Sequence, residues 1–259
     1  MAIDQAWFSD RFDDLKASVA FLTRLPFPRT EPITGAGIAR AVWAIPIAGI
    51  LVGLFGALVF MLARRAGLPA WPGAALTLAA TLAATGCLHE DGLADTADGF
   101  GGGRTRQQKL DIMRDSRTGA YGVCALALSI LLRASALASL SDPALVAPAL
   151  IAAHGAGRAT MPVLMFLAPP ARADGLSYDM GRPPRDSVAA AAVLGIVLLA
   201  ICLGPALGLA AIVLLGAAIA AMAWLSVTQI DGQTGDVLGA LEQISEIIVL
   251  LVALRLVRG

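Results

Sequence analysis

The sequence has little charge, few aromatic residues and few cysteines. Only 15% of its 259 residues are charged, 5% are aromatic, and the formal net charge is zero. Without an excess of positive charge, a nucleic-acid-binding surface is excluded. The cysteines Cys87, Cys124 and Cys202 stand singly in apolar runs, which excludes a disulfide framework or a zinc knot. Residues 1–14 lack the basic and apolar regions of a signal peptide, so we expect none.

Hydrophobic residues and glycine dominate instead. The chain is 58% hydrophobic, contains 27 glycines and has a mean hydropathy of +0.76. Its Ala/Leu/Gly-rich runs are about 20 residues long, which is the span of a bilayer core, so a soluble α/β protein is excluded. We predict an all-α, polytopic transmembrane bundle that forms a single domain over residues 1–259. About seven spans are expected, at roughly 42–63, 71–88, 119–140, 144–168, 187–204, 206–226 and 237–257.

Two further segments are too short or too polar to span. Residues 1–14 predict an amphipathic or disordered lead-in, and residues 15–25 predict a short interfacial or re-entrant helix ended by Pro26 and Pro28. A cytoplasmic helix is expected at about 105–117, with Thr105 as its cap. In the span at 144–168, Pro148 and Pro162 predict a kink or an interruption.

The basic residues predict the orientation. With seven spans, the N-terminal segment and the connections 89–118, 169–186 and 227–236 lie on one side and hold most of the arginines. The other side holds Arg64, Arg65, Arg255 and Arg258, with Arg133 near a helix end. The positive-inside rule therefore makes the first side cytoplasmic.

Four acids fall within residues 90–98, between an apolar run and a glycine cluster. On a helix, Asp91, Asp95 and Asp98 share one face and repel one another unless a cation lies between them. Mg²⁺ is the candidate, because it takes oxygen ligands and bridges carboxylates to phosphates. The alternative is a solvated acidic helix end at the membrane surface.

A glycine loop and basic residues follow the acids. Gly99 and residues 101–103 predict positive φ angles or a close backbone approach to a ligand. The candidate phosphate-binding residues are Gly101, Gly102, Arg104, Arg106, Lys109, Arg114 and Arg117. A surface helix with i, i+4 ion pairs is the alternative for the basic helix.

Other polar residues lie within or at the start of predicted spans. His154 and Arg158 in one span, and Glu242 and Glu246 in another, stand at i, i+4 and are natural partners. These residues either form part of a functional site or are buried structural ion pairs that set the register of the helices. Asp236 either caps the last span or joins the first acidic cluster to complete a metal site.

Several segments together resemble the cobalamin synthase (adenosylcobinamide-GDP ribazoletransferase) family. They are LHEDGLADTADG at 88–99 and the segments 109–122, 21–26 and 232–240. The resemblance implies a Mg²⁺-dependent, multi-pass enzyme of the bacterial cell inner membrane with cytoplasmic active-site loops. It implies transfer of the adenosylcobinamide phosphate group from adenosylcobinamide-GDP to α-ribazole or its 5′-phosphate, with release of GMP, in the last assembly steps of vitamin B12.

Under that resemblance, residue roles follow as hypotheses. Asp91, Asp95, Asp98 and Asp236 are assigned to Mg²⁺, and His89, Glu90 or an uncommitted aspartate to the general base. His89 is alternatively a plain interfacial residue. The rival function is a polytopic transporter with a cytoplasmic acidic cation site, for which the polar residues in the spans would form an ion path. Further alternatives are a homo-oligomer, a complex with other late-pathway enzymes, and a structural scaffold for such a complex.

Overall fold

The computed structural model describes residues 5–24 and 34–258, and this part of the chain is helical with no strand. The elements are α1 (Gln5–Leu22), α2 (Gly35–Ala41), η1 (Val42–Ala44), α3 (Ile45–Arg65), α4 (Ala70–Thr85), α5 (Leu88–Gly102), α6 (Arg106–Ile112), α7 (Ala120–Leu140), α8 (Pro143–Leu167), α9 (Leu176–Met180), α10 (Arg185–Leu203), α11 (Pro205–Ile230), α12 (Gly235–Ala253) and η2 (Leu254–Arg258). Six of the described helical segments are long and apolar enough to cross a membrane, or up to seven if α4 and α5 form one bent span. The all-α polytopic prediction is confirmed.

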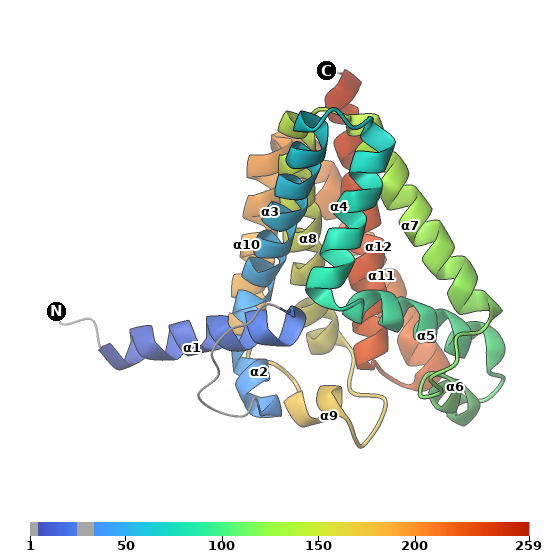
Figure 1. The fold of residues 1–259 in the computed structure, drawn as a ribbon. Coiled ribbons are helices and arrows are strands. Elements are labelled where there is room, and N and C mark those ends of the chain that lie inside the picture. Colours follow the sequence, from blue (N-terminus) through green and yellow to red (C-terminus); the bar gives the residue numbers. More distant parts are fainter. Residues whose placement is uncertain (1–4, 25–33, 259) are drawn as a thin grey trace.

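The second predicted span ends in a sharp bend. Gly86 and Cys87 both adopt left-handed backbone angles, at φ 64° and 57°. Gly86 has no Cβ to oppose this conformation and ends α4 as a helix C-cap. The chain then turns by 90° into α5. We therefore treat α4 as the membrane-spanning part, while α5 lies across the end of the bundle (Figure 1).

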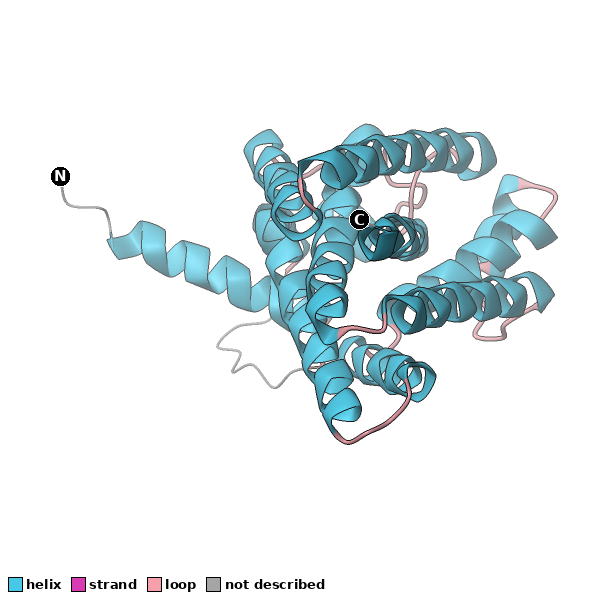
Figure 2. Ribbon diagram, turned by 90° about the horizontal axis from the view of Figure 1, so that it is seen from above, coloured by secondary structure: helices cyan, strands magenta, loops and turns pink. Residues whose placement is uncertain are grey.

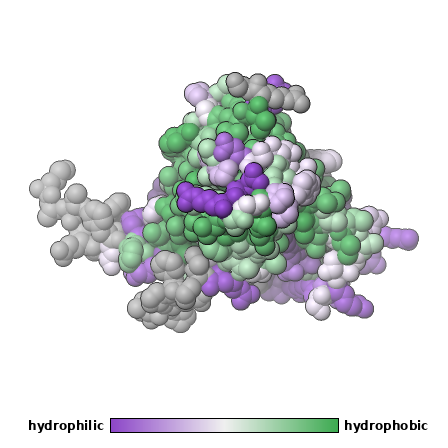
Figure 3. All heavy atoms as spheres, turned by 45° about the horizontal axis from the view of Figure 1, so that its top comes forward, coloured by the Kyte–Doolittle hydropathy of each residue, from purple (hydrophilic) through white to green (hydrophobic). Residues whose placement is uncertain are grey.

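The short helices gather at one end of the bundle. In Figure 1, α1, α2, α5, α6 and α9 lie below the upright helices, and the C-terminus and the α3–α4 connection lie at the top. We call these the α5 end and the C-terminal end. The connections that were predicted to share one side do share the α5 end. Hydrophobic residues cover most of the flanks, and hydrophilic residues gather at the two ends (Figure 3).

Helix α8 packs against α3, α10 and α12 and so forms the centre of the bundle. Figure 2 looks down on the bundle from the C-terminal end. Small residues allow this close approach: a Cβ added at Gly53 of α3 would lie 2.7 Å from the Leu150 carbonyl oxygen of α8. Pro148 and Pro162 lie inside α8 without ending it. Of the two predicted alternatives, the interruption is therefore wrong, and the kink stays a prediction.

The N-terminal helix is longer than predicted. Helix α1 begins at Gln5, so much of the expected lead-in is folded. Asp14 is buried and accepts hydrogen bonds from Arg40 Nε at 2.9 Å and from Trp43 Nε1 at 3.0 Å. These bonds hold α1 against α2 and η1, across the base of the bundle, as expected for an interfacial helix (Figure 1). Residues 1–4 and the predicted helix stop at Pro26 and Pro28 lie outside the described residues.

The predicted helix at 105–117 is shorter in the structure. Thr105 caps α6 as expected, in a capping box with Gln108. The helix ends at Ile112, and residues 113–119 form turns that lead into α7.

Candidate active site at the crossing of α5 and α12

Helices α5 and α12 cross through glycines. A Cβ added at Gly92 would lie 2.8 Å from the Asp236 carbonyl oxygen, and one at Gly239 would lie 3.2 Å from the His89 Cα. Neither position leaves room for a larger residue without movement of a backbone. This close approach places the acidic face of α5 beside the first turn of α12.

The crossing concentrates negative charge. Burial, followed by the nearby carboxylates of Asp91, Asp236 and Asp98, raises the pKa of Asp95 to about 7. Arg172 acts in the opposite direction, with a smaller effect. When ionised, these four carboxylates together carry more negative charge than Arg172 offsets. An oxygen-only set of carboxylates with excess negative charge fits a hard divalent cation such as Mg²⁺.

Asp236 does not cap α12. The cap is Thr234, whose hydroxyl accepts a hydrogen bond from the Val237 amide, and that hydroxyl also donates to Asp236 Oδ2 at 3.1 Å. The Thr234 hydroxyl caps α12, so the prediction that Asp236 caps this helix is wrong. The Asp236 carboxylate instead lies 3.8 Å from Arg172 Nη2. Asp231 lies at the surface and pairs with Arg106 at 2.9 Å.

Asp98 has a structural partner that spacing alone did not reveal. Its two oxygens accept hydrogen bonds from the backbone amides of Gly119 at 2.6 Å and Gly122 at 2.9 Å. These amides belong to the start of α7, where amides have no partner within the helix. Asp98 is also buried. It therefore ties α5 to α7.

The glycines after the acids are helical. Helix α5 continues to Gly102, and none of Gly99 and residues 101–103 has a positive φ. The predicted glycine loop with positive φ angles is wrong. The glycines instead allow close packing within the chain: a Cβ at Gly101 would lie 2.7 Å from the Tyr121 ring, and one at Gly103 would lie 2.7 Å from the Lys109 amide nitrogen.

The basic residues separate into two groups. Arg106 and Arg114 line a polar cavity of about 370 Å³, together with Arg172, which we call the arginine cavity. Arg106 also donates to the carbonyl oxygens of Ile230 and Ala171, Lys109 donates to Gln229, and Arg114 pairs with Asp174. Arg104 is exposed, and Arg117 is exposed and pairs with Asp115. Arg104 and Arg117 do not line this cavity.

Arg172 is the residue that sequence reasoning missed. It lines both the arginine cavity and a neighbouring cavity of about 220 Å³ that reaches Asp236. Burial lowers its pKa, and its Nε has no partner among the described residues. The only signal in the sequence was its presence in a connection on the arginine-rich side.

A buried ion network lies beneath the crossing. Arg158 Nη1 pairs with Glu242 at 2.6 Å and with Glu246 at 3.1 Å, and His154 pairs with Glu246. The structure thus brings the four predicted intramembrane polar residues together. Arg133 joins them: it is buried in α7 and bonds both Glu90 and Glu246 at 3.1 Å, rather than lying near a helix end. Because arginines already pair with both glutamates of α12, we assign no metal to the His154, Glu242 and Glu246 group.

His89 connects this network to the acidic site. Its Nδ1 lies 3.4 Å from Glu242 Oε2 and 3.3 Å from Arg158 Nη2. Its Nε2 is buried and has no hydrogen-bond partner among the described residues. His89 also lines a cavity of about 190 Å³ with Asp91 and Asp236. One ring nitrogen therefore contacts the network, and the other has no hydrogen-bond partner among the described residues.

Comparison with known proteins shows the family of this chain. The family model for cobalamin-5-phosphate synthase matches residues 14–254. The chain belongs to this family. An adenosylcobinamide-GDP ribazoletransferase of Bradyrhizobium diazoefficiens is 55% identical over 240 residues, covering 93% of this chain and 92% of the relative. One of Mesorhizobium japonicum is 55% identical over 241 residues, with the same coverage, and one of Azorhizobium caulinodans is 43% identical over 247 residues, covering 92% and 94%. No solved structure matches the chain.

The family membership answers the question of function class that the sequence left open. The match includes every candidate site residue, from His89 to Glu246. The transporter and scaffold alternatives receive no support, since the matched family is one of synthases.

Proposed function

We propose that this protein is an adenosylcobinamide-GDP ribazoletransferase of the bacterial inner membrane. A ribose hydroxyl of α-ribazole, or of its 5′-phosphate, attacks the phosphorus that carries the cobinamide. The new O–P bond forms as the bond from that phosphorus to the bridging oxygen of GMP breaks, and the hydroxyl proton is removed. The observation that carries the proposal is the family match together with the carboxylates that influence one another near the crossing of α5 and α12.

Asp91, Asp95 and Asp236 are the residues that we propose would hold Mg²⁺. The raised pKa of Asp95 supports this assignment, because it arises from burial and then from neighbouring carboxylate charges, which a bound cation would offset. When bound, Mg²⁺ would neutralise the pyrophosphate and the charge that develops on departing GMP. For Asp98 we propose a positioning role, since its oxygens hold the Gly119 and Gly122 amides and keep the acidic face of α5 in place.

The arginine cavity is the proposed site for the diphosphate of the donor. Arg106, Arg114 and Arg172 offer guanidinium groups there, and guanidinium is suited to paired contacts with phosphate oxygens. Arg172 also borders Asp236, so it would contact the phosphate nearest the proposed metal ligands. Gly101, Gly102, Arg104, Lys109 and Arg117 stay predicted phosphate-binding residues, although none of them lines this cavity.

His89 is our proposed general base. Glu90 Oε1 pairs with Arg133 and Glu90 does not line the cavity of Asp91 and Asp236, while both oxygens of Asp98 accept hydrogen bonds from amides. Among the described residues His89 Nε2 has no hydrogen-bond partner, and His89 lines the same cavity as Asp91 and Asp236. The Nε2 atom of a neutral histidine can accept the proton of a hydroxyl group when Nδ1 carries the ring hydrogen.

The test is turnover by the purified protein in lipid nanodiscs. Adenosylcobinamide-GDP, α-ribazole and Mg²⁺ should yield adenosylcobalamin and GMP in equal amounts, measured by liquid chromatography with mass spectrometry. Donor hydrolysis without formation of the cobalamin product, or no reaction in a properly folded sample, would contradict the proposal.

The membrane orientation is tested separately. With the α5 end in the cytoplasm, where charged substrates are available, a C-terminal alkaline phosphatase fusion should be active and a C-terminal green fluorescent protein fusion dark. The reverse pattern would overturn the orientation. The oligomeric state, alone or with other late-pathway enzymes, stays a prediction for mass photometry of the nanodisc sample.

A further inference from the structure

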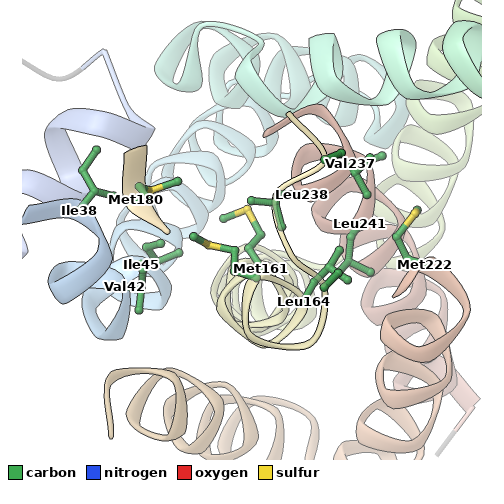
Figure 4. Packing of buried hydrophobic residues seen from close by; sticks show 14 of the residues in the cluster. Ile38, Val42, Ile45, Met161, Leu164, Met180, Met222, Val237, Leu238 and Leu241 are labelled. Carbon is green, nitrogen blue, oxygen red and sulfur yellow. The ribbon is translucent and has the colours of Figure 1, made fainter. Parts of the chain in front are cut away.

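The cavity that contains His89, Asp91 and Asp236 has a second, apolar half. The whole cavity encloses about 190 Å³ between α1, α5, α8, α12 and the α2–α3 and α9 segments. Away from the acids its wall includes Met161, Met165 and Met180, with Ile38, Ile45 and Phe21. We call this space the methionine cavity. Figure 4 shows Met161 on α8 facing Leu238 of α12 on one side and Ile45 on the other.

Its size restricts the occupant. An apolar cavity of about 150 Å³ holds a benzene ring, so a cavity of about 190 Å³ in total, polar end included, suits an aromatic base of one or two rings. A corrin macrocycle is far larger than this cavity. Guanine, with its many polar edge atoms, would meet mostly methyl, methylene and thioether groups here, at a cost in lost hydrogen bonds. An apolar benzimidazole would not incur that cost, and methionine sulfur packs favourably against aromatic rings.

The polar end restricts how the occupant lies. His89 is buried, yet its Nε2 has no hydrogen-bond partner among the described residues. Buried polar atoms are normally paired, so this nitrogen points to a ligand group such as a sugar hydroxyl. Asp91 and Asp236 line the same end. A nucleoside with an apolar base and a polar sugar matches both halves in one orientation.

We propose that the methionine cavity binds the acceptor α-ribazole, with its benzimidazole base against the methionines and its ribose at His89, Asp91 and Asp236. The donor's diphosphate would then approach from the arginine cavity on the other side of Asp236. This inference rests on the proposed function and deepens it, because it assigns the two substrates to separate cavities.

Met161→Trp tests the assignment by filling the cavity. We expect the KM for α-ribazole to rise roughly tenfold or more, in the range of pocket-size effects, with the KM for adenosylcobinamide-GDP unchanged within about twofold. Met161→Leu keeps the volume and should behave as wild type. Met222→Trp is the matched control: Met222 is equally a buried methionine of the same hydrophobic cluster but lies on α11, outside the cavity (Figure 4). It should leave both KM values unchanged.

A second variant and a binding measurement test the assignment even if Met161→Trp does not fold. If Met161→Trp does not fold, Met165→Phe replaces it with the same expectation. Titration of α-ribazole into wild-type nanodiscs without donor should give calorimetric binding that the filled variant loses.

Two results would overturn the assignment while leaving the proposed function intact: a donor KM that rises alone, or active variants with unchanged KM for α-ribazole. A lipid found in the wild type by native mass spectrometry and lost in the variant, with unchanged kinetics, would identify an acyl-chain site instead. A wild type that forms no cobalamin overturns the proposed function itself.

Discussion

The Gly92 Cα in α5 packs against the backbone of Asp236 in α12, so closely that an added Cβ would lie 2.8 Å from the Asp236 carbonyl oxygen. Residues 144 positions apart along the chain are thus in contact at the centre of the candidate site. The distance between the acidic face of α5 and the start of α12 depends on this glycine. Any cation shared by Asp91, Asp95 and Asp236 depends on it as well.

Gly92→Ala should therefore remove activity. Its methyl group would push α5 and α12 apart, and small misplacements at a reacting centre cost roughly a hundredfold in rate. Gly216→Ala in α11 is the matched control, because an added Cβ there would meet nothing within 4 Å. Measured kcat should fall by about two orders of magnitude for the first variant and stay near wild type for the second. Equal activity of both variants would contradict the role of the crossing.

Asp95→Asn should abolish turnover and weaken Mg²⁺ binding. An amide keeps the shape of the side chain but loses the charge that a hard cation requires. Mg²⁺ titration calorimetry on nanodiscs gives the binding, and GMP release gives the turnover. Removal of divalent cations with EDTA should stop the wild type, and added Mg²⁺ should restore it. Asp111→Asn, an exposed acid in α6, serves as the control and should leave both quantities unchanged.

His89→Gln should lower kcat by about a hundredfold or more with little change in either KM, as expected for loss of a general base. Glu90→Gln separates the two base candidates. Glu90 pairs with Arg133, so its neutralisation should lower thermal stability and leave kcat within a few-fold of wild type. A larger loss of kcat from Glu90→Gln than from His89→Gln would reverse the assignment.

Arg133→Met should destabilise the fold. It leaves the buried Glu90 and Glu246 without one of their cations, and breaking a buried pair typically costs about 3–5 kcal/mol. Thermal unfolding in detergent should show a clear fall in Tm. Arg117→Gln removes an exposed partner of Asp115 and should not change Tm measurably. An unchanged Tm for Arg133→Met would mean that the network contributes little to stability.

Arg172→Gln should raise the KM for adenosylcobinamide-GDP by at least about tenfold, because a guanidinium–phosphate contact is lost where water is partly excluded. The KM for α-ribazole should stay unchanged, which distinguishes this variant from Met161→Trp. Arg104→Gln, at an exposed position near the same end, is the comparison and should have a small effect. Equal effects of the two variants would indicate general electrostatic attraction rather than a binding contact.

Properties that depend on neighbours along the chain were determined by the sequence alone. Hydropathy and run length located the spans, since crossing a bilayer needs about 20 apolar residues whatever the tertiary contacts. The i, i+4 spacing put Asp91 and Asp95 on one face, and it paired His154 with Arg158 and Glu242 with Glu246 along their helices. The distribution of arginine separated the two ends of the bundle. Each of these follows from local geometry or from total composition.

Only the tertiary structure decided what each charged group meets across helices. Spacing made Asp98 equivalent to Asp91, but the start of α7 lies against it and uses its oxygens. Spacing also left Arg133 and Arg172 undistinguished from other arginines, until the packing buried one in the ion network and placed the other beside Asp236. The physical reason is that helices pack through residues far apart in sequence, at distances set by the smallest side chains between them. Gly92 and Gly239 set that distance here, and no periodicity within α5 or α12 could have shown that they meet.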